Sequence, residues 1–300
     1  MNRTVRLRAF SKVNLGLKII RKRPDGYHEI QTVYQTVALH DRLTLSLANS
    51  PSGIHLECDD PRVPAGQSNL VHRACGLWCR ARNYHGGIRV RLQKKIPMGS
   101  GLGGASADAA AALMGLERLT GNRLSPETRL KLAAQLGSDV PLFLWGGRVL
   151  GCGRGEEVYP LWDLPKRQCL IVFPGFSVST AWAYGQASRA ASLRLTEERK
   201  GPNMKRFGAW SHFPLTDWGP AENDFEKVVF ARWPELARLK RRLIRAGAES
   251  TSLTGSGSSV FAVFDSARKL LSASRFIPAG WQTFPTRTIA RAEYERAVFA

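Results

Sequence analysis

A glycine-rich loop that runs directly into an alanine-rich segment most strongly constrains the fold of this 300-residue chain. The loop carries glycines at 99, 101, 103 and 104, and residues 105–119 after it are rich in alanine and leucine, which favour an α-helix. Glycines allow tight backbone turns and leave the N–H groups unobstructed. Because the first N–H groups of a helix have no partner within it, this junction predicts an anion site.

Two common phosphate-binding motifs do not fit this loop. Gly99-x-Gly101-x-x-Gly104 matches the dinucleotide fingerprint, but that motif follows a buried parallel strand, whereas alternate residues of 89–93 are polar. A Walker A loop would end in Gly-Lys-Ser or Gly-Lys-Thr, and this loop does not. A different phosphate cradle remains, with Lys94 and Lys95 upstream as further cations. The alternative is an ordinary strand-to-helix connection.

The remaining patterns predict an α+β protein. Strands are predicted over 5–9, 30–39, 43–47, 88–92, 169–173 and 260–264, with a break at His40-Asp41 and a loop with a short hairpin over 49–68. Helices are predicted over 69–82, 105–119, 126–136 and 235–246. Pro160 and Pro165 interrupt the pattern, so we expect two domains, 1–165 and 166–300.

Composition excludes several classes of protein. Hydrophobic residues make up 43% of the chain and charged residues 23%, which is typical of globular proteins. The 5 cysteines form no Cys-x-x-Cys pair, so neither a disulfide framework nor structural zinc is indicated. No run approaches the ~18 apolar residues of a membrane span, and residues 1–8 lack the apolar part of a signal peptide. We therefore expect a cytoplasmic protein with no membrane partner.

The net charge of +20 favours polyanionic ligands. The basic residues fall in separate clusters, at 21–23, 80–95, 205–206 and 240–242, rather than in one stripe with interleaved aromatic residues. A solvated, arginine-rich surface is the simpler interpretation, so we expect no nucleic acid as a partner. A basic nucleic-acid-binding protein stays open as an alternative function.

Residues 97–108, Pro-Met-Gly-Ser-Gly-Leu-Gly-Gly-Ala-Ser-Ala-Asp, resemble the phosphate loop of the GHMP kinases, which include galactokinase, homoserine kinase and mevalonate kinase. Further segments follow in the order that one branch of this superfamily shows, at 9–15, 23–30, 136–143, 223–226 and 253–261. Ala105 stands where that branch more often has a third glycine, and Phe10-Ser11 precedes Lys12 where Pro-Ala or Cys-Ala is commoner. Residues 195–220 match nothing in the branch.

The resemblance implies a two-domain GHMP kinase fold, with an N-terminal domain like domain 2 of ribosomal protein S5 and a ferredoxin-like C-terminal domain. In the branch concerned, ATP phosphorylates the 2-hydroxyl of 4-diphosphocytidyl-2-C-methyl-D-erythritol, a step of the non-mevalonate (MEP) route to isoprenoid precursors. The expected ligands are thus ATP and a cytidine diphosphate sugar alcohol, bound to a monomer or homodimer. Phosphorylation of another small alcohol, such as homoserine or mevalonate, is the enzymatic alternative.

The resemblance also implies which residues bind ATP. They are Pro97, Met98, Gly99, Ser100, Gly101, Leu102, Gly103, Gly104, Ala105, Ser106 and Ala107. Mg²⁺ is expected to enter on the ATP phosphates, where Ser106 would contact it, because the sequence shows no carboxylate cluster. We assign no metal ligand of the protein.

Asp139 is the candidate general base. It lies between a helix end and an apolar run, a setting that can desolvate a carboxylate. By residue type alone it could equally cap the short helix that Pro141 begins. The resemblance implies that Lys12 pairs with Asp139 and the acceptor hydroxyl, and that Asn14 adds a hydrogen bond near that alcohol.

Tyr27 and His28 follow the turn at 23–26, where their rings can contact a ligand. An aromatic ring can stack on cytosine, and an imidazole can hydrogen-bond to its edge. The alternative is a tyrosine that covers the turn and a solvent-facing histidine. Tyr184 is the candidate for the second face of the cytosine sandwich, with a core aromatic as its alternative. The loop at 254–259 has the glycines and hydroxyls to approach either substrate.

Overall fold

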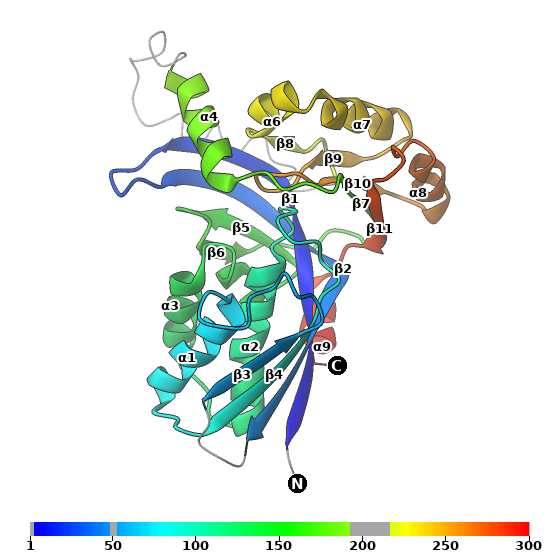
Figure 1. Cartoon of the computed structure of the whole chain (residues 1–300). Coiled ribbons are helices and arrows are strands. Elements are labelled where there is room, and N and C mark those ends of the chain that lie inside the picture. Colours follow the sequence, from blue (N-terminus) through cyan, green and yellow to red (C-terminus); the bar gives the residue numbers. More distant parts are fainter. Residues whose placement is uncertain (1–2, 49–52, 193–216, 300) are drawn as a thin grey trace.

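The computed structural model describes residues 3–48, 53–192 and 217–299 (Figure 1). The strands are β1 (Thr4–Lys22), β2 (His28–Ala48), β3 (Ile54–Cys58), β4 (Gly87–Gln93), β5 (Arg148–Cys152), β6 (Glu157–Pro160), β7 (Gln168–Phe173), β8 (Glu222–Asn223), β9 (Ser250–Leu253), β10 (Val260–Phe264) and β11 (Gln282–Arg287). The helices are α1 (Leu70–Arg82), α2 (Gly104–Thr120), α3 (Pro126–Leu136), the 3₁₀ helix η1 (Pro141–Leu144), α4 (Thr180–Ser192), α6 (Glu226–Arg232), α7 (Pro234–Arg245), α8 (Ala267–Ser274) and α9 (Arg291–Ala297).

The described strands form two sheets. The first has the order β3-β4-β2-β1-β8, with β5 paired to β2 and β6 to β5, and the second has the order β11-β7-β10-β9. In the first sheet, β3 pairs with β4 and β1 pairs with β8 in parallel, and the other strand pairs are antiparallel. Figure 1 shows α1, α2 and α3 with the first sheet, and α6, α7 and α8 with the second.

Helix α2 packs close to the first sheet because the side chains that face the sheet are small. The alanines at 109–112 in α2 are buried. A Cβ added at Gly115 would come within 2.4 Å of Leu45 and 2.8 Å of Leu7. A larger residue at this position would have to push the Leu45 and Leu7 side chains aside, so glycine lets α2 cross close to these strands. Strand alternation supplies the other half of this core, since Leu7, Leu45 and Val90 are buried between polar neighbours.

Helix boundaries follow the predicted signals. The Ser125 side chain caps α3 by accepting a hydrogen bond from the Thr128 N–H, Pro126 is the first helical residue, and the helix ends before Gly137. Two other expectations were wrong. β2 continues through His40-Asp41, because the buried Asp41 carboxylate is neutralised by Lys94 and accepts the Ile96 N–H. The segment 54–58 pairs in parallel with β4 rather than forming a hairpin.

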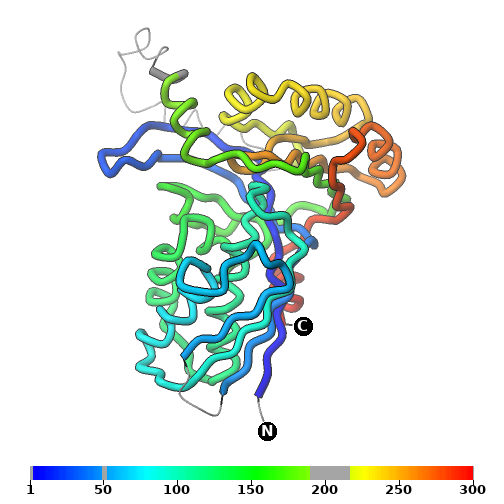
Figure 2. The backbone as a smooth tube through the Cα atoms, in the orientation of Figure 1, coloured from blue at the N-terminus to red at the C-terminus, as the bar shows by residue number. Residues whose placement is uncertain are grey.

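The two halves of the chain share structure. β1 and β2 are long enough to reach the second sheet, where Val13 and Leu15 join a buried cluster with Ile171 and Phe261. The predicted boundary at 165/166 falls between β6 and β7, but β8 and the C-terminal segment return to the first sheet. In Figure 2 the red C-terminal segment runs back beside the blue N-terminal strand, and Phe299 bridges to Leu7. Residues 195–216 of the unmatched segment lie outside the described residues.

Candidate active site

Two cavities meet at the glycine loop. The larger, about 890 Å³, lies between the two sheets and is lined by Lys12, Asn14, Tyr27, His28, Asp139 and Tyr184, among others. The smaller, about 330 Å³, is lined by residues 97–106 together with Asn69 and Leu70 at the start of α1. Gly101, Gly103 and Ser106 line both cavities. A ligand in the smaller cavity can thus reach the larger one across this loop.

The loop has a backbone conformation that only glycine adopts readily. Gly99, Gly101 and Gly103 have φ of +63°, +80° and +74°. A Cβ on Gly101 would lie 2.2 Å from the Thr254 carbonyl oxygen, so the loop packs directly against the segment 254–257 of the second domain. The Thr254 hydroxyl donates a hydrogen bond to the Gly101 carbonyl at 3.1 Å. The lack of a side chain at Gly101 therefore allows the loop of the first half to contact the backbone of the second half directly.

The predicted ATP-binding residues divide into two groups. Pro97 to Ser106 all line the smaller cavity. Ala107 lines neither cavity, because it is buried in α2 and its N–H donates to the Gly103 carbonyl within the helix. The loop residues are therefore brought together as expected, and the first helical turn contributes up to Ser106.

Lys94 and Lys95 do not serve as free cations beside the loop. The Lys94 ammonium contacts Asp41 and lies 2.7 Å from Asp108 Oδ2, and all three side chains are largely buried. Lys95 lies outside both cavities. Burial raises the pKa of Asp108 to about 7; attraction to Lys94 opposes this shift, and repulsion from Asp41 adds to it. This buried cluster anchors the entry to the loop instead.

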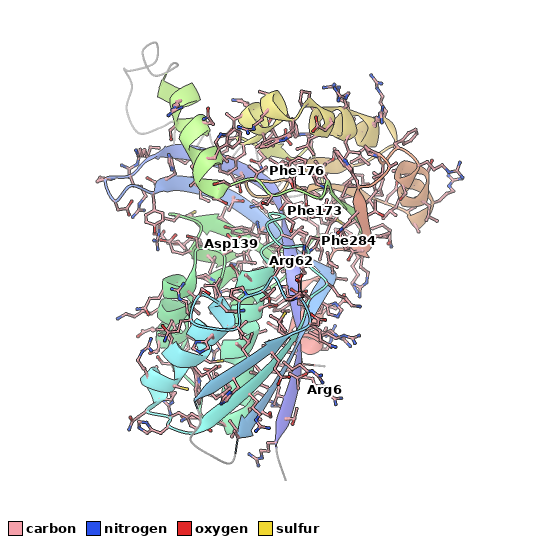
Figure 3. The ribbon with its side chains drawn as sticks, in the orientation of Figure 1. Arg6, Arg62, Asp139, Phe173, Phe176 and Phe284 are labelled. Atoms are coloured by element: carbon pink, nitrogen blue, oxygen red, sulfur yellow. The ribbon has the colours of Figure 1, made fainter. Side chains whose placement is uncertain are left out.

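Lys12 and Asp139 form the polar centre of the larger cavity. Lys12 Nζ lies 3.4 Å from Asp139 Oδ2, and the Tyr34 hydroxyl donates to Asp139 Oδ1 at 3.1 Å. The Lys12 side chain is 3% exposed and that of Asp139 is 31% exposed, so the carboxylate keeps an open side toward the cavity. Burial, followed by the charge of Asp139, raises the pKa of Tyr34, which keeps its hydroxyl protonated as a donor. η1 has no side-chain cap, so Asp139 does not have the capping role. Figure 3 shows Asp139 near the junction of the two halves.

Asn14 positions its neighbours. Its Oδ1 accepts hydrogen bonds from Lys12 Nζ and from the Gly255 N–H, both at 2.8 Å. Its Nδ2 donates to the Thr32 hydroxyl at 2.8 Å. Asn14 is 1% exposed, and its carbonyl oxygen is occupied within the protein. Its observed contacts therefore orient Lys12 and join β1 to the second domain. Asn14 also lines the larger cavity, and its expected contact with the acceptor alcohol stays a prediction.

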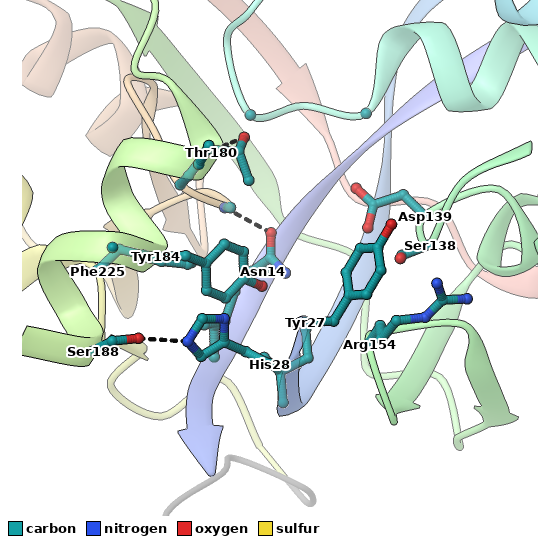
Figure 4. Close-up of a pocket in the computed structure, with 18 of the residues that line it drawn as sticks. Asn14, Tyr27, His28, Ser138, Asp139, Arg154, Thr180, Tyr184, Ser188 and Phe225 are labelled. Carbon is teal, nitrogen blue, oxygen red and sulfur yellow. Dashed lines mark hydrogen bonds between the residues drawn. The ribbon is translucent and has the colours of Figure 1, made fainter. Parts of the chain in front are cut away.

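The three predicted aromatic residues gather on the same cavity. The His28 and Tyr184 rings stack at 4.7 Å between centroids, and the Tyr184 ring meets Phe225 edge-on. In Figure 4 Tyr27 faces this pair across the open part of the cavity. Burial, followed by the charge of Lys22, lowers the pKa of His28, which favours a neutral imidazole. His28 Nε2 contacts the Ser188 hydroxyl, so one ring nitrogen is already engaged.

Sequence reasoning missed several residues of this cavity, among them Tyr34, Arg154 and Phe225. The Arg154 guanidinium lies 4.8 Å from the centre of the Tyr27 ring and is held by Glu156, with Nε 2.9 Å from Oε1. Phe225, which supports Tyr184, lies in a segment quoted for the resemblance, and that segment was its only signal. The predicted loop at 254–259 does reach the cavity, through Gly255 and Ser256.

Within the described residues, no three His, Cys, Asp or Glu side chains cluster as metal ligands. No helix in the same part of the chain is long and apolar enough to cross a membrane.

Comparisons with known proteins agree with this architecture. The profile described as GHMP kinases N terminal domain matches residues 69–147, and that described as GHMP kinases C terminal matches residues 203–282. The homoserine kinase from Cytophaga hutchinsonii superposes with a TM-score of 0.66 at 20% identity, covering 98% of this chain and 97% of that one. At this identity the match shows the shared fold alone. The predicted two-domain GHMP kinase fold is confirmed.

More similar proteins carry one name. The 4-diphosphocytidyl-2-C-methyl-D-erythritol kinase of Solibacter usitatus is 44% identical over 264 residues, which cover 87% of this chain and 82% of the relative. That of Pelotomaculum thermopropionicum is 39% identical, covering 93% and 96%. A crystal structure of 4-(cytidine 5'-diphospho)-2C-methyl-D-erythritol kinase matches with a TM-score of 0.76 at 32% identity, covering 94% and 98%. On these matches, the chain belongs to the 4-diphosphocytidyl-2-C-methyl-D-erythritol kinase family of the GHMP kinases.

Proposed function

We propose that Asp139 is the general base that activates the 2-hydroxyl of 4-diphosphocytidyl-2-C-methyl-D-erythritol for attack on the γ-phosphate of ATP. The chain is an ATP-dependent kinase of its family. The observation that carries the residue assignment is the pair of cavities that share Gly101, Gly103 and Ser106, with the Asp139 carboxylate open to the larger one.

The contacts support a division of roles. ATP in the smaller cavity would lay its phosphates over the loop, whose backbone and helix N-terminus favour negative charge. The acceptor hydroxyl would then give its proton to Asp139 as its oxygen bonds to the γ-phosphorus and the bond to the β-phosphate oxygen breaks. Lys12, held by Asn14, would stabilise the charge on the transferring group. Tyr34 would keep Asp139 oriented through its hydrogen bond.

The aromatic wall supports a nucleotide-bearing acceptor. Homoserine and mevalonate have no ring to stack, whereas a cytosine can lie between Tyr27 and Tyr184 with its edge toward His28. The neutral imidazole favoured at His28 can offer a donor or an acceptor to that edge. Relatives of the homoserine kinase type share only the fold with this chain.

Mg²⁺ fits the site as an ion carried by the nucleotide. The Ser106 hydroxyl lines both cavities and would contact the ion, and phosphate oxygens and water would complete its coordination. When bound, the ion neutralises phosphate charge.

Asp139→Asn tests the assignment. The amide preserves the size of the side chain and still accepts the Tyr34 hydrogen bond, but it cannot take a proton at neutral pH. We expect kcat to fall by a factor on the order of 10² or more, with ATP affinity retained. Asp265→Asn, at an exposed aspartate paired with Lys269, is the matched control and should turn over like the parent. Near-parent turnover by Asp139→Asn would rule out Asp139 as the base.

A further inference from the structure

Part of the net charge of +20 gathers on one face of the first sheet. Alternate side chains of a strand point to opposite faces of its sheet. Leu7, Leu43 and Leu92 take the parity that is buried with the helices. The other parity carries Arg6, Arg8, Arg42, Arg89 and Arg91, which we call the arginine face. Figure 3 shows Arg6 pointing away from α1 and α2.

Strand pairing places these arginines side by side. Arg8 lies opposite Arg42 on β2, and Arg6 and Arg91 lie on either side of Thr44. Like charges directly opposite each other on a sheet destabilise it. The sequence did not reveal this grouping, because the arginines come from three strands that are far apart along the chain. Arg8 and Arg42 are 34 residues apart, and Arg89 follows Arg42 by 47 residues.

The arginine face carries five arginines and one nearby acid, Glu57 on β3, which lies opposite Arg91 in the strand register. None of its five arginines has a carboxylate within 4.0 Å among the described residues, in contrast to Arg62 with Asp60 and Arg129 with Glu117. A hollow of about 530 Å³ lies on the face, lined by Thr44, Ser46, His55, Glu57, Arg89 and Arg91. The arginines and hydroxyls of this hollow donate to phosphate oxygens, whereas the single carboxylate, Glu57, can only accept hydrogen bonds and repels phosphate.

We propose that the arginine face binds the phosphate backbone of a nucleic-acid duplex without reading its base sequence. The forked guanidinium groups match phosphate oxygens, and the Thr44 and Ser46 hydroxyls add neutral donors. A bound backbone would also relieve the repulsion between Arg8 and Arg42.

The side chains of the arginine face favour a duplex over a single-stranded nucleic acid or a membrane surface. No large hydrophobic side chain is exposed on β1, β2, β3 or β4 as the structure describes them. A single strand would need aromatic rings for base stacking, and a membrane surface is bound in part through apolar side chains. None of the five arginines lines either cavity of the active site, so the interaction leaves the kinase reaction free.

The test is fluorescence anisotropy with labelled RNA and DNA duplexes of about 20 base pairs at about 50–200 mM salt. The parent should bind both duplexes, with log K falling with log salt at a slope of about −4. The variant tested is Arg6→Gln/Arg42→Gln/Arg89→Gln/Arg91→Gln. The magnitude of its salt slope should decrease by about 3 to 4, and its affinity for duplexes at low salt should fall at least tenfold. Unchanged kinase activity checks that this variant is folded.

The control removes the same charge elsewhere. Arg238→Gln/Arg241→Gln/Arg242→Gln/Arg245→Gln changes four exposed arginines of α7 and should bind duplexes like the parent. Equal losses in both variants would overturn the proposal, since total charge would then explain the binding. So would a parent that binds neither duplex, one that binds single strands more tightly, or one that binds only phosphatidylserine vesicles.

Discussion

Tyr27 is the most exposed of the three aromatic residues on the larger cavity, at 55%. The Tyr27 ring faces Tyr184 across the cavity, and the Arg154 guanidinium packs against the Tyr27 ring. A side chain this exposed adds little to the stability of the fold, so its role is best sought in ligand binding.

Tyr27→Ala should weaken binding of the cytidine substrate. Stacking on an aromatic ring stabilises a base by about 1–3 kcal/mol, so KM for 4-diphosphocytidyl-2-C-methyl-D-erythritol should rise roughly tenfold or more while KM for ATP stays unchanged. Tyr159→Ala, at a residue with 53% exposure outside both cavities, is the matched control. Steady-state kinetics with each substrate varied would check this, and an unchanged KM for the cytidine substrate would remove Tyr27 from its site.

Asp108 should make the stability of the chain depend on pH. Its pKa is raised from 3.8 to about 7 in the folded chain, so the folded state binds a proton there that the unfolded state releases between these values. The contribution of Asp108 to stability is therefore lost as pH rises through that window. Asp108→Asn cannot ionise. Its Tm relative to the parent should rise from about pH 5 to about pH 7.5, and a constant difference in Tm would contradict the shift.

Individual site residues could be predicted only where a local motif marks them. Lys12 and Asp139 stand in recognisable segments, and the structure brings them together as expected, 3.4 Å apart. The bonds of Asn14 to Gly255 and of Lys94 to Asp41 join positions 241 and 53 residues apart, so no local pattern announces them. For that reason the sequence could not reveal the protein contacts that hold Asn14 and Lys94 in place beside the two cavities.

At the scale of elements, the glycine loop and the segment 254–257 act as one unit. Asn223 Nδ2 donates to the carbonyls of Leu253 and Gly255, both at 2.8 Å, which secures that segment against the loop. The loop itself was predictable, because its glycines and the following alanines are contiguous in the sequence. The surface that it packs against was not, because that surface comes from the other domain.

Gly101→Ala should disrupt this unit. The added Cβ would lie 2.2 Å from a backbone oxygen, so the loop or the segment 254–257 must shift, and both Tm and ATP affinity should fall. Gly121→Ala is the control, since φ there is +72° but no atom lies within 4 Å of the added Cβ. It should cost only about 1–2 kcal/mol of backbone strain and leave ATP binding unchanged. If the two variants bind ATP equally well, the close contact at Gly101 does not shape the nucleotide site.

At the scale of the whole molecule, the two halves build the active site together. β1 provides Lys12 and Asn14, whereas Tyr184, Phe225 and Gly255 come from the second half. The α+β class, the helices α1, α2, α3 and α7 and parts of β1, β2, β4, β7 and β10 followed from local sequence patterns, and the GHMP kinase fold followed from the family resemblance. The return of β8 and the C-terminus to the first sheet and the gathering of arginines on its open face required the three-dimensional structure, because both depend on contacts between distant segments.

The central claim is that one loop delivers the ATP phosphate to a cavity built for a cytidine-bearing alcohol. The most direct test is ADP release by the purified protein with Mg-ATP and each of four acceptors: 4-diphosphocytidyl-2-C-methyl-D-erythritol, its cytidine-free alcohol, homoserine and mevalonate. We predict release with the first acceptor and none above background with the other three. Equal release with the cytidine-free alcohol, or release only with homoserine or mevalonate, would contradict the account.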